Sequence, residues 1–133
     1  MRFRKLAALA IAAGAAGAAS WAPALSSNGM AHHSFAMFDS TKEVTVVGTV
    51  KDFQWTNPHA WLQVNVPGAD GKTVEWSFEG GSPGILSRNG WKRTSVKPGD
   101  KVTVIFYPLK DGKPGGSFLE VKAPDGKTYY YPG

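Results

Sequence analysis

Three histidines are the residues of this sequence most able to do chemistry. His32 and His33 are adjacent in the segment MAHHSFAMFD, residues 30–39, and His59 follows an Asn-Pro pair further along the chain. If the chain is cleaved after Ala31, the free amine and one ring nitrogen of His32 can chelate a single metal ion. A third nitrogen from His33 or His59 completes a donor set that suits Cu(II) among the divalent metals. The histidines therefore predict a copper site made of His32, His33 and His59.

Two other interpretations of the histidines stay open at this point. An adjacent pair near a chain terminus can simply be solvated, and each ring can hydrogen-bond an organic ligand instead of a metal. Met37 and Asp39 follow closely and would add a thioether and a carboxylate to a metal site. The pattern is not a zinc signature, because the chain has no cysteine and no pair of histidines one helical turn apart.

A second candidate site is the segment DFQWTNPHAWLQ, residues 52–63. Trp55 and Trp61 flank the turn that the Asn57-Pro58 pair predicts. Two indoles and a carboxamide at the rim of a barrel can stack on a ring and hydrogen-bond it. Trp55, Asn57 and Trp61 are therefore the candidate residues for a small-molecule or envelope-component ligand that needs no metal. In a purely structural interpretation, one of these tryptophans plugs the end of the barrel.

No catalytic constellation is identified, so we expect a binding module rather than an enzyme. The sequence contains no cysteine nucleophile, and the carboxylates that could serve His59, which are Asp52, Glu75 and Glu79, are all distant from it in sequence. A copper oxygenase built on an N-terminal histidine ranks below simple binding, because a domain of about one hundred residues offers little area for a polymer. An envelope interaction domain that uses exposed edge strands is a third possible class.

The first thirty-one residues have the layout of a secretory signal peptide. Three basic residues precede an uncharged run that is rich in alanine and too short to span a membrane as a helix. Small residues favour cleavage after Ala31 or, alternatively, after Ala24. We therefore expect residues 1–31 to be removed and no transmembrane segment to remain. Residues 32–133 then form one exported domain, periplasmic or extracellular.

The charge of this expected domain argues against one class of partner. Residues 1–31 carry three of the fifteen basic residues and none of the ten acidic ones, which leaves twelve basic and ten acidic residues and a net charge of +2. So small an excess, together with export, disfavours nucleic-acid binding. The chain also has no cysteine, so its core or a bound ligand must hold it together without disulfides.

Hydrophobic residues alternate with period two from Val44 onward, and frequent Gly and Pro predict an all-β domain with one short helix. We expect strands over residues 43–55, 60–66, 73–79, 101–109 and 117–123, with a candidate sixth strand in the tail. Gly48 would let the first strand bend. The helix should begin after an N-cap at Ser82 and stop at Gly90. This order predicts a five- to six-stranded barrel of the oligonucleotide/oligosaccharide-binding (OB) type, with a small β-sandwich as the alternative.

Four segments together resemble a family of small exported bacterial proteins catalogued as a domain of unknown function. They are AHHSFAMFD, GTVKDFQWTNPHAWL, WSFEGGSPGILSRNGW and VKPGDKVTV. The markers are a His-His-Ser-Phe start, a Trp-x-Asn-Pro-His centre and a Ser-Pro-x-x-Leu-x-x-x-Gly-Trp helix. The resemblance covers residues 32–127 and implies a compact exported β-domain. It also implies that the family's motifs include His32, His33, Asn57, Pro58, His59 and Trp61.

Overall fold

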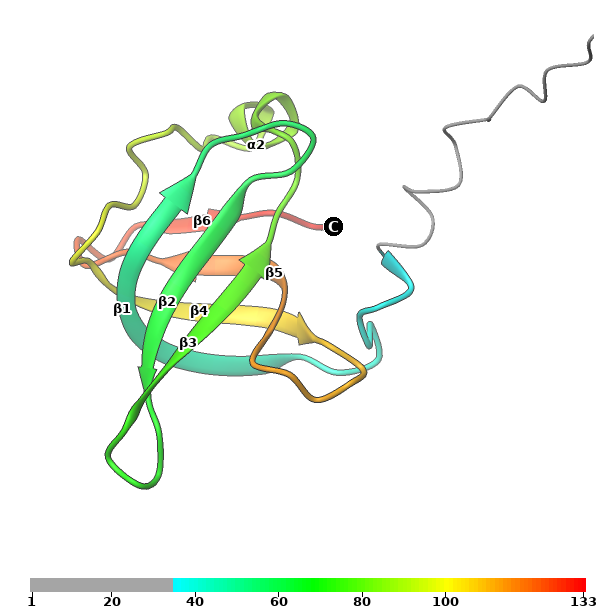
Figure 1. The fold of residues 1–133 in the computed structure, drawn as a ribbon. Coiled ribbons are helices and arrows are strands. Elements are labelled where there is room, and N and C mark those ends of the chain that lie inside the picture. Colours follow the sequence, from blue (N-terminus) through cyan, green and yellow to red (C-terminus); the bar gives the residue numbers. More distant parts are fainter. Residues whose placement is uncertain (1–34) are drawn as a thin grey trace, which may run out of the picture.

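The strands of this chain close into a barrel, as the computed structural model in Figure 1 shows. The structure describes residues 35–133, so the predicted signal peptide and both of its cleavage sites lie outside the described residues. The elements in chain order are β1 (Val44–Gln54), β2 (Trp61–Pro67), β3 (Thr73–Glu79), α2 (Pro83–Arg88), β4 (Lys101–Pro108), β5 (Gly115–Lys122) and β6 (Thr128–Tyr130). The helix lies between the third and fourth strands, as predicted.

The order of strands is that of an OB-type barrel. Neighbouring strands follow the order β3-β2-β1-β4-β5-β6, and β3 also pairs with β5. This extra pairing closes a five-stranded barrel and leaves β6 as an additional strand beside β5. The predicted all-β fold with one short helix is therefore confirmed as a closed barrel and not as a sandwich.

Two glycines let β5 lie close to both β3 and β4, where the barrel closes. The pairing of β3 with β5 is parallel and short, and it matches Ser77 with Gly115 and Glu79 with Ser117. A β-carbon on Gly115 would collide with the carbonyl oxygen of Ser77, and one on Gly116 would collide with that of Tyr107. The sequence pattern predicts that this strand begins at residue 117, because glycine is uncommon in strands. The strand begins two residues earlier, at Gly115.

The first strand bends where the sequence predicts it. Residues Val44 to Thr49 pair with β4, whereas Thr49 to Gln54 pair with β2. Gly48 lies at this change of partner, and a β-carbon there would lie 2.5 Å from the carbonyl oxygen of Asn65. The glycine therefore lets β1 curve from one side of the barrel to the other (Figure 1).

The core lies inside the barrel and is covered at one end by the α2 segment. Ser82 caps the helix, because its Oγ accepts a hydrogen bond from the Ile85 backbone amide at 3.3 Å. Trp91 follows the helix and is 2 % exposed. Its indole Nε1 donates to the Tyr130 carbonyl oxygen at 2.9 Å, and its ring centroid lies 5.1 Å from that of Phe118. Trp91 thus belongs to the buried core of the barrel.

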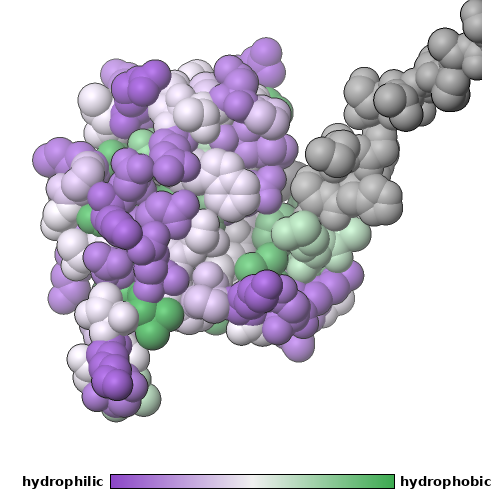
Figure 2. All heavy atoms as spheres, viewed as in Figure 1, coloured by the Kyte–Doolittle hydropathy of each residue, from purple (hydrophilic) through white to green (hydrophobic). Residues whose placement is uncertain are grey.

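The surface of the barrel is mainly polar in the view of Figure 2, where hydrophobic atoms gather at the point at which the described chain begins. Phe35 and Met37 in that segment are each about half exposed. Across residues 35–133, the structure contains no helix with the length and apolar character needed to span a bilayer.

Candidate functional site

The β2–β3 hairpin brings His59 to the end of β3. Trp61 pairs with Glu79 across the two strands. Beyond that pair, the Gly80 amide donates to the Ala60 carbonyl oxygen, and the Ala60 amide donates to the Gly81 carbonyl oxygen, both at 2.9 Å. His59 directly precedes this extension of the ladder, so its ring faces the junction of β3 with the double glycine.

The His59 ring is held through one of its two nitrogens. Its Nδ1 lies 2.9 Å from the Gly80 carbonyl oxygen and 3.2 Å from Glu79 Oε1. A carbonyl and a carboxylate both accept hydrogen bonds, so Nδ1 carries a hydrogen, and in a neutral ring Nε2 then carries the lone pair. No hydrogen bond within residues 35–133 occupies Nε2, and the side chain is 37 % exposed. In a neutral histidine held in this way, Nε2 is the ring nitrogen left to accept a hydrogen bond or to coordinate a ligand.

Glu79 is the buried carboxylate of the described chain. The residue is 6 % exposed, and burial raises the pKa of its carboxyl group, while the neighbouring His59 acts in the opposite direction. Burial and the charge of Glu79 together raise the pKa of the Tyr131 phenol. No lysine or arginine among the described residues forms an ion pair with Glu79, and its Oε1 lies 3.2 Å from His59 Nδ1.

A small cavity of about 40 Å³ lies against this pair. Its walls include Phe35, Phe38, His59, Glu79, Ser117 and Tyr131. A space of this size holds one water molecule or one ion and no organic substrate. The cavity is polar at His59, Glu79 and Ser117 and aromatic at Phe35, Phe38 and Tyr131.

The N-terminal segment is fastened beside the cavity by backbone contacts. Phe38 forms an isolated β-bridge with Leu109, and the Asp39 amide donates to the Pro108 carbonyl oxygen at 2.8 Å. The Lys110 amide donates to the Met37 carbonyl oxygen at 2.9 Å. Residues 37–39 are therefore held by β4 and the connection that follows it, and Phe38 of this segment lines the His59 cavity.

The structure does not place the predicted rim residues on one face. Trp55 packs on Phe53, with 5.7 Å between ring centroids, and contacts the core. Trp61 lies on the outer face of β2, because its neighbour Leu62 points inward and is fully buried. Asn57 is exposed in the turn between them, and its bond to Pro58 is cis. His32 and His33 lie outside the described residues.

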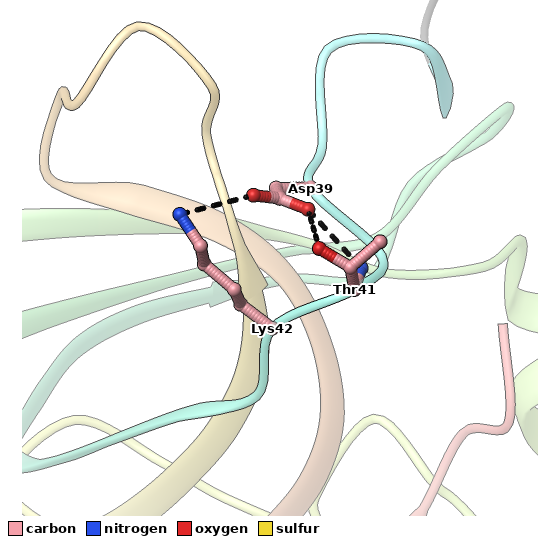
Figure 3. A network of polar contacts seen from close by, with 3 residues as sticks. All are labelled: Asp39, Thr41 and Lys42. Atoms are coloured by element: carbon pink, nitrogen blue, oxygen red, sulfur yellow. Dashed lines mark hydrogen bonds and ion pairs between the residues drawn. The ribbon is translucent and has the colours of Figure 1, made fainter.

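Figure 3 shows that Asp39 is engaged in a turn. Its Oδ1 accepts hydrogen bonds from the Thr41 amide at 3.1 Å and the Thr41 hydroxyl at 2.5 Å, and its Oδ2 lies 3.3 Å from Lys42 Nζ. The hydrogen bonds from Thr41 are the main reason that the pKa of Asp39 is lowered. Met37 lines a different hollow, together with Leu109, and is not among the residues that line the His59 cavity. Neither residue joins His59.

One segment between a strand and the helix matches the Gly-x-Ser-x-Gly motif of a nucleophile elbow, and it consists of Gly80-Gly81-Ser82-Pro83-Gly84. Ser82 has φ −64° and ψ 155°, which is ordinary extended backbone, and its hydroxyl is used as the helix cap. Among the described residues, no hydrogen bond joins His59 to Ser82 or to the buried Ser117. The segment is therefore a capped connection.

Sequence reasoning named Glu79 only as one of three carboxylates at unknown distance from His59, and it missed the aromatic walls of the cavity. Glu79 was detectable in principle, since the register of the predicted hairpin places it opposite Trp61. Tyr131, Phe35 and Phe38 come from segments without a pairing signal in the sequence. Within residues 35–133, no three His, Cys, Asp or Glu side chains lie together in a way that would hold a metal ion.

Comparison with known families assigns the chain. Residues 22–119 match the sequence profile of the Family of unknown function (DUF6152). The chain belongs to this family. The predicted membership of a domain-of-unknown-function family is thus confirmed, and the matched DUF6152 range includes His32, His33 and His59. Comparison with curated proteins gives no match. Tyr131 and β6 lie beyond the DUF6152 range.

Proposed function

We propose that this protein is an exported copper-binding module whose metal site combines the N-terminal His32 with His33 and His59. One observation carries the proposal. Nδ1 of His59 is held by Glu79 and the Gly80 carbonyl, which leaves Nε2 as the ligand atom beside a cavity that Phe35 also lines. Outer hydrogen bonds of this kind accompany metal-binding histidines in general.

The covalent chain keeps the three histidines within reach of one another. His33 precedes Phe35 by two residues and His32 precedes it by three. A fully extended chain advances at most ~3.6 Å per residue, so the α-carbons of His33 and His32 are within about 7 Å and 11 Å of that of Phe35. Both histidines can therefore approach His59 without any change in the barrel.

The chemistry of the donors favours copper. The free amine and ring nitrogen of His32 form a chelate, and imidazole nitrogens from His33 and His59 add further donors of the same type. Amine and imidazole nitrogens in a tetragonal arrangement suit Cu(II). The buried carboxylate of Glu79 next to His59 adds a negative charge that favours a bound cation. Processing after Ala31 is part of the proposal, because it frees the amine of His32.

The test compares two N-termini of the same chain. A protein that begins at His32 is titrated with Cu(II) by calorimetry beside a protein that begins at Leu25, which keeps all three histidines but lacks a free amine on His32. We expect one tightly bound ion in the first protein and an affinity lower by about tenfold or more in the second and in His59→Ala. An Asp52→Asn variant changes an exposed carboxylate near the same turn and serves as the control.

Equal copper affinity in the two proteins and in His59→Ala would show that the proposal is wrong. The rim residues Trp55, Asn57 and Trp61 would then be tested with small cyclic ligands in the absence of metal, with tryptophan fluorescence as the readout. Native mass spectrometry of the exported protein, purified without a tag or a chelator, reports its N-terminus and any retained copper. An exported chain that begins at Leu25 would also contradict the proposal.

A further inference from the structure

A hollow of about 300 Å³ lies on the outer face of the sheet, where β4, β5 and β6 are neighbours (Figure 1). Phe106, Phe118 and Tyr129 of these strands are buried in the core, so the residues that alternate with them face outward. A bulge between β4 and β5 adds one residue to the β5 side of the hollow. The aliphatic and aromatic part of the lining consists of Ile105, Tyr107, Leu119, Tyr130 and Pro132.

Two carboxylates line the hollow together with these side chains. Glu120 of β5 pairs with Ile105 of β4 on one side and with Tyr130 of β6 on the other. Glu43 directly precedes β1 and lines the same hollow. No lysine, arginine or histidine is among the described residues that line it. The hollow therefore combines two tyrosines and an apolar surface with two negative charges.

Neither carboxylate has a polar partner in the described part of the chain. The other acidic side chains of residues 35–133, except Asp52, pair with a lysine or with His59 or accept a hydrogen bond from a backbone amide. Lys122 follows Glu120 by two residues on β5, and no ion pair among the described residues joins them. Two of the three carboxylates without such a partner thus share one hollow, although residues 32–133 carry a net charge of +2.

We propose that this hollow binds a small quaternary ammonium ion. The charge of such an ion is spread over methyl groups, so the same group can contact an apolar surface and be attracted by carboxylates. A cation near a tyrosine ring is also attracted by the electrons of the ring face. Metal ions and primary amines are more strongly hydrated and gain little from apolar walls. A volume of about 300 Å³ is at the lower end of small-molecule sites and limits the ligand to about the size of choline.

The inference does not depend on the proposed copper site. None of the three histidines lines the hollow among the described residues, and its floor belongs to other strands than the one that carries Glu79. Glu120, Tyr130 and Pro132 also lie beyond the range that matches DUF6152. Binding of the ammonium ion should therefore be the same in His59→Ala as in the wild-type protein.

The experiment separates charge from shape in the ligand. Choline and the neutral alcohol dimethylbutanol, in which a carbon atom replaces the nitrogen, are titrated into isotope-labelled protein, and binding is followed by amide chemical shifts. We expect choline to shift the amides of Glu120 and Tyr130 in a saturable way. Dimethylbutanol should bind about fivefold more weakly, because it lacks the attraction to the carboxylates. Added salt should weaken choline binding and leave dimethylbutanol binding unchanged.

Variants of the protein separate the ring from the carboxylate. Tyr130→Ala should weaken choline binding about two- to fivefold, the range for a cation–π contact at an exposed site, and Tyr130→Phe should bind as the wild type does. Glu120→Gln keeps the size of the side chain and should weaken binding about fivefold. Glu75→Gln is the matched control, because it removes the same charge from an exposed strand residue that does not line the hollow.

Three results would overturn the inference. The first is choline that produces no saturable shifts at Glu120 and Tyr130. The second is equal affinity for choline and dimethylbutanol, which would reduce the hollow to an apolar surface. The third is Glu120→Gln that binds choline as tightly as Glu75→Gln does. If Tyr130→Ala fails to fold, Glu120→Gln still decides the question. Loss of copper binding in His59→Ala, or its retention, leaves each of these results unchanged.

Discussion

Two glycines four residues apart should respond in opposite directions to the same added methyl group. A β-carbon on Gly80 would collide with the ring of Phe118, with Cε1 at 2.5 Å, and this ring is fully buried. Overpacking of this kind costs about 1–3 kcal/mol. A β-carbon on Gly84 meets nothing closer than Ser82 Oγ at 3.9 Å, within α2. Replacing a helical glycine by alanine stabilises by roughly 0.5–1 kcal/mol.

The assay is thermal unfolding of Gly80→Ala and Gly84→Ala beside the wild-type protein, followed by circular dichroism. One kcal/mol shifts the melting temperature of a domain of about one hundred residues by about 4–8 °C. Gly80→Ala should therefore melt roughly 4–24 °C lower and Gly84→Ala roughly 2–8 °C higher. A melting temperature of Gly80→Ala equal to that of the wild type would refute the close packing of Phe118 against the double glycine, and with it the placement of the Gly80 carbonyl beside His59.

Two further predictions concern the barrel end and the effect of pH. Trp91→Phe leaves the Tyr130 carbonyl without its indole donor and should lower the free energy of unfolding by about 1–3 kcal/mol. Trp61→Phe on the outer face should lower it by under about 0.5 kcal/mol. Equal midpoints of urea unfolding for the two variants would contradict this prediction. Burial raises the pKa of Glu79 above its ordinary value of 4.5, so the folded state holds the proton to higher pH than the unfolded state does. This contribution to stability is complete below pH 4.5 and declines as pH rises through the raised pKa. Glu79→Gln should remove this decline when melting temperatures are measured between about pH 4 and 7. If the melting temperature of Glu79→Gln falls with pH as steeply as that of the wild type, the carboxyl group is not desolvated.

The barrel was predictable because its strands and helix carry local signals. The alternation in residues 73–79 gave β3 with both of its bounds, and Ser82 and Gly90 marked the ends of the α2 segment. The start of β5 was placed two residues late, since Gly115 and Gly116 are selected by the close approach of β3 and Tyr107 rather than by strand propensity. Closure is a tertiary requirement, and no local pattern expresses it.

The candidate site was less predictable, for a reason that lies in β1. A bulge between Val50 and Asp52 shifts the alternation, so that Phe53 and Trp55 follow Val50 on the core side. Strict period two would have turned Trp55 outward, toward the face of Trp61. A bulge adds one residue to one strand and has no sequence signature of its own here. His59 was found from its type alone, while its contact with Glu79 depends on the hairpin register.

The walls of the His59 cavity come from near both ends of the described chain. Phe35 lines it from the N-terminal segment, and Tyr131 lines it just after β6, where its amide donates to the Leu119 carbonyl oxygen at 2.7 Å. Terminal segments are usually the first parts of a domain to open, and a ligand that binds only the assembled form stabilises that form by mass action. An ion bound in this cavity would therefore hold both terminal segments in place at once. Amide hydrogen exchange in both segments should then be slower in the ion-bound protein than in the ion-free protein.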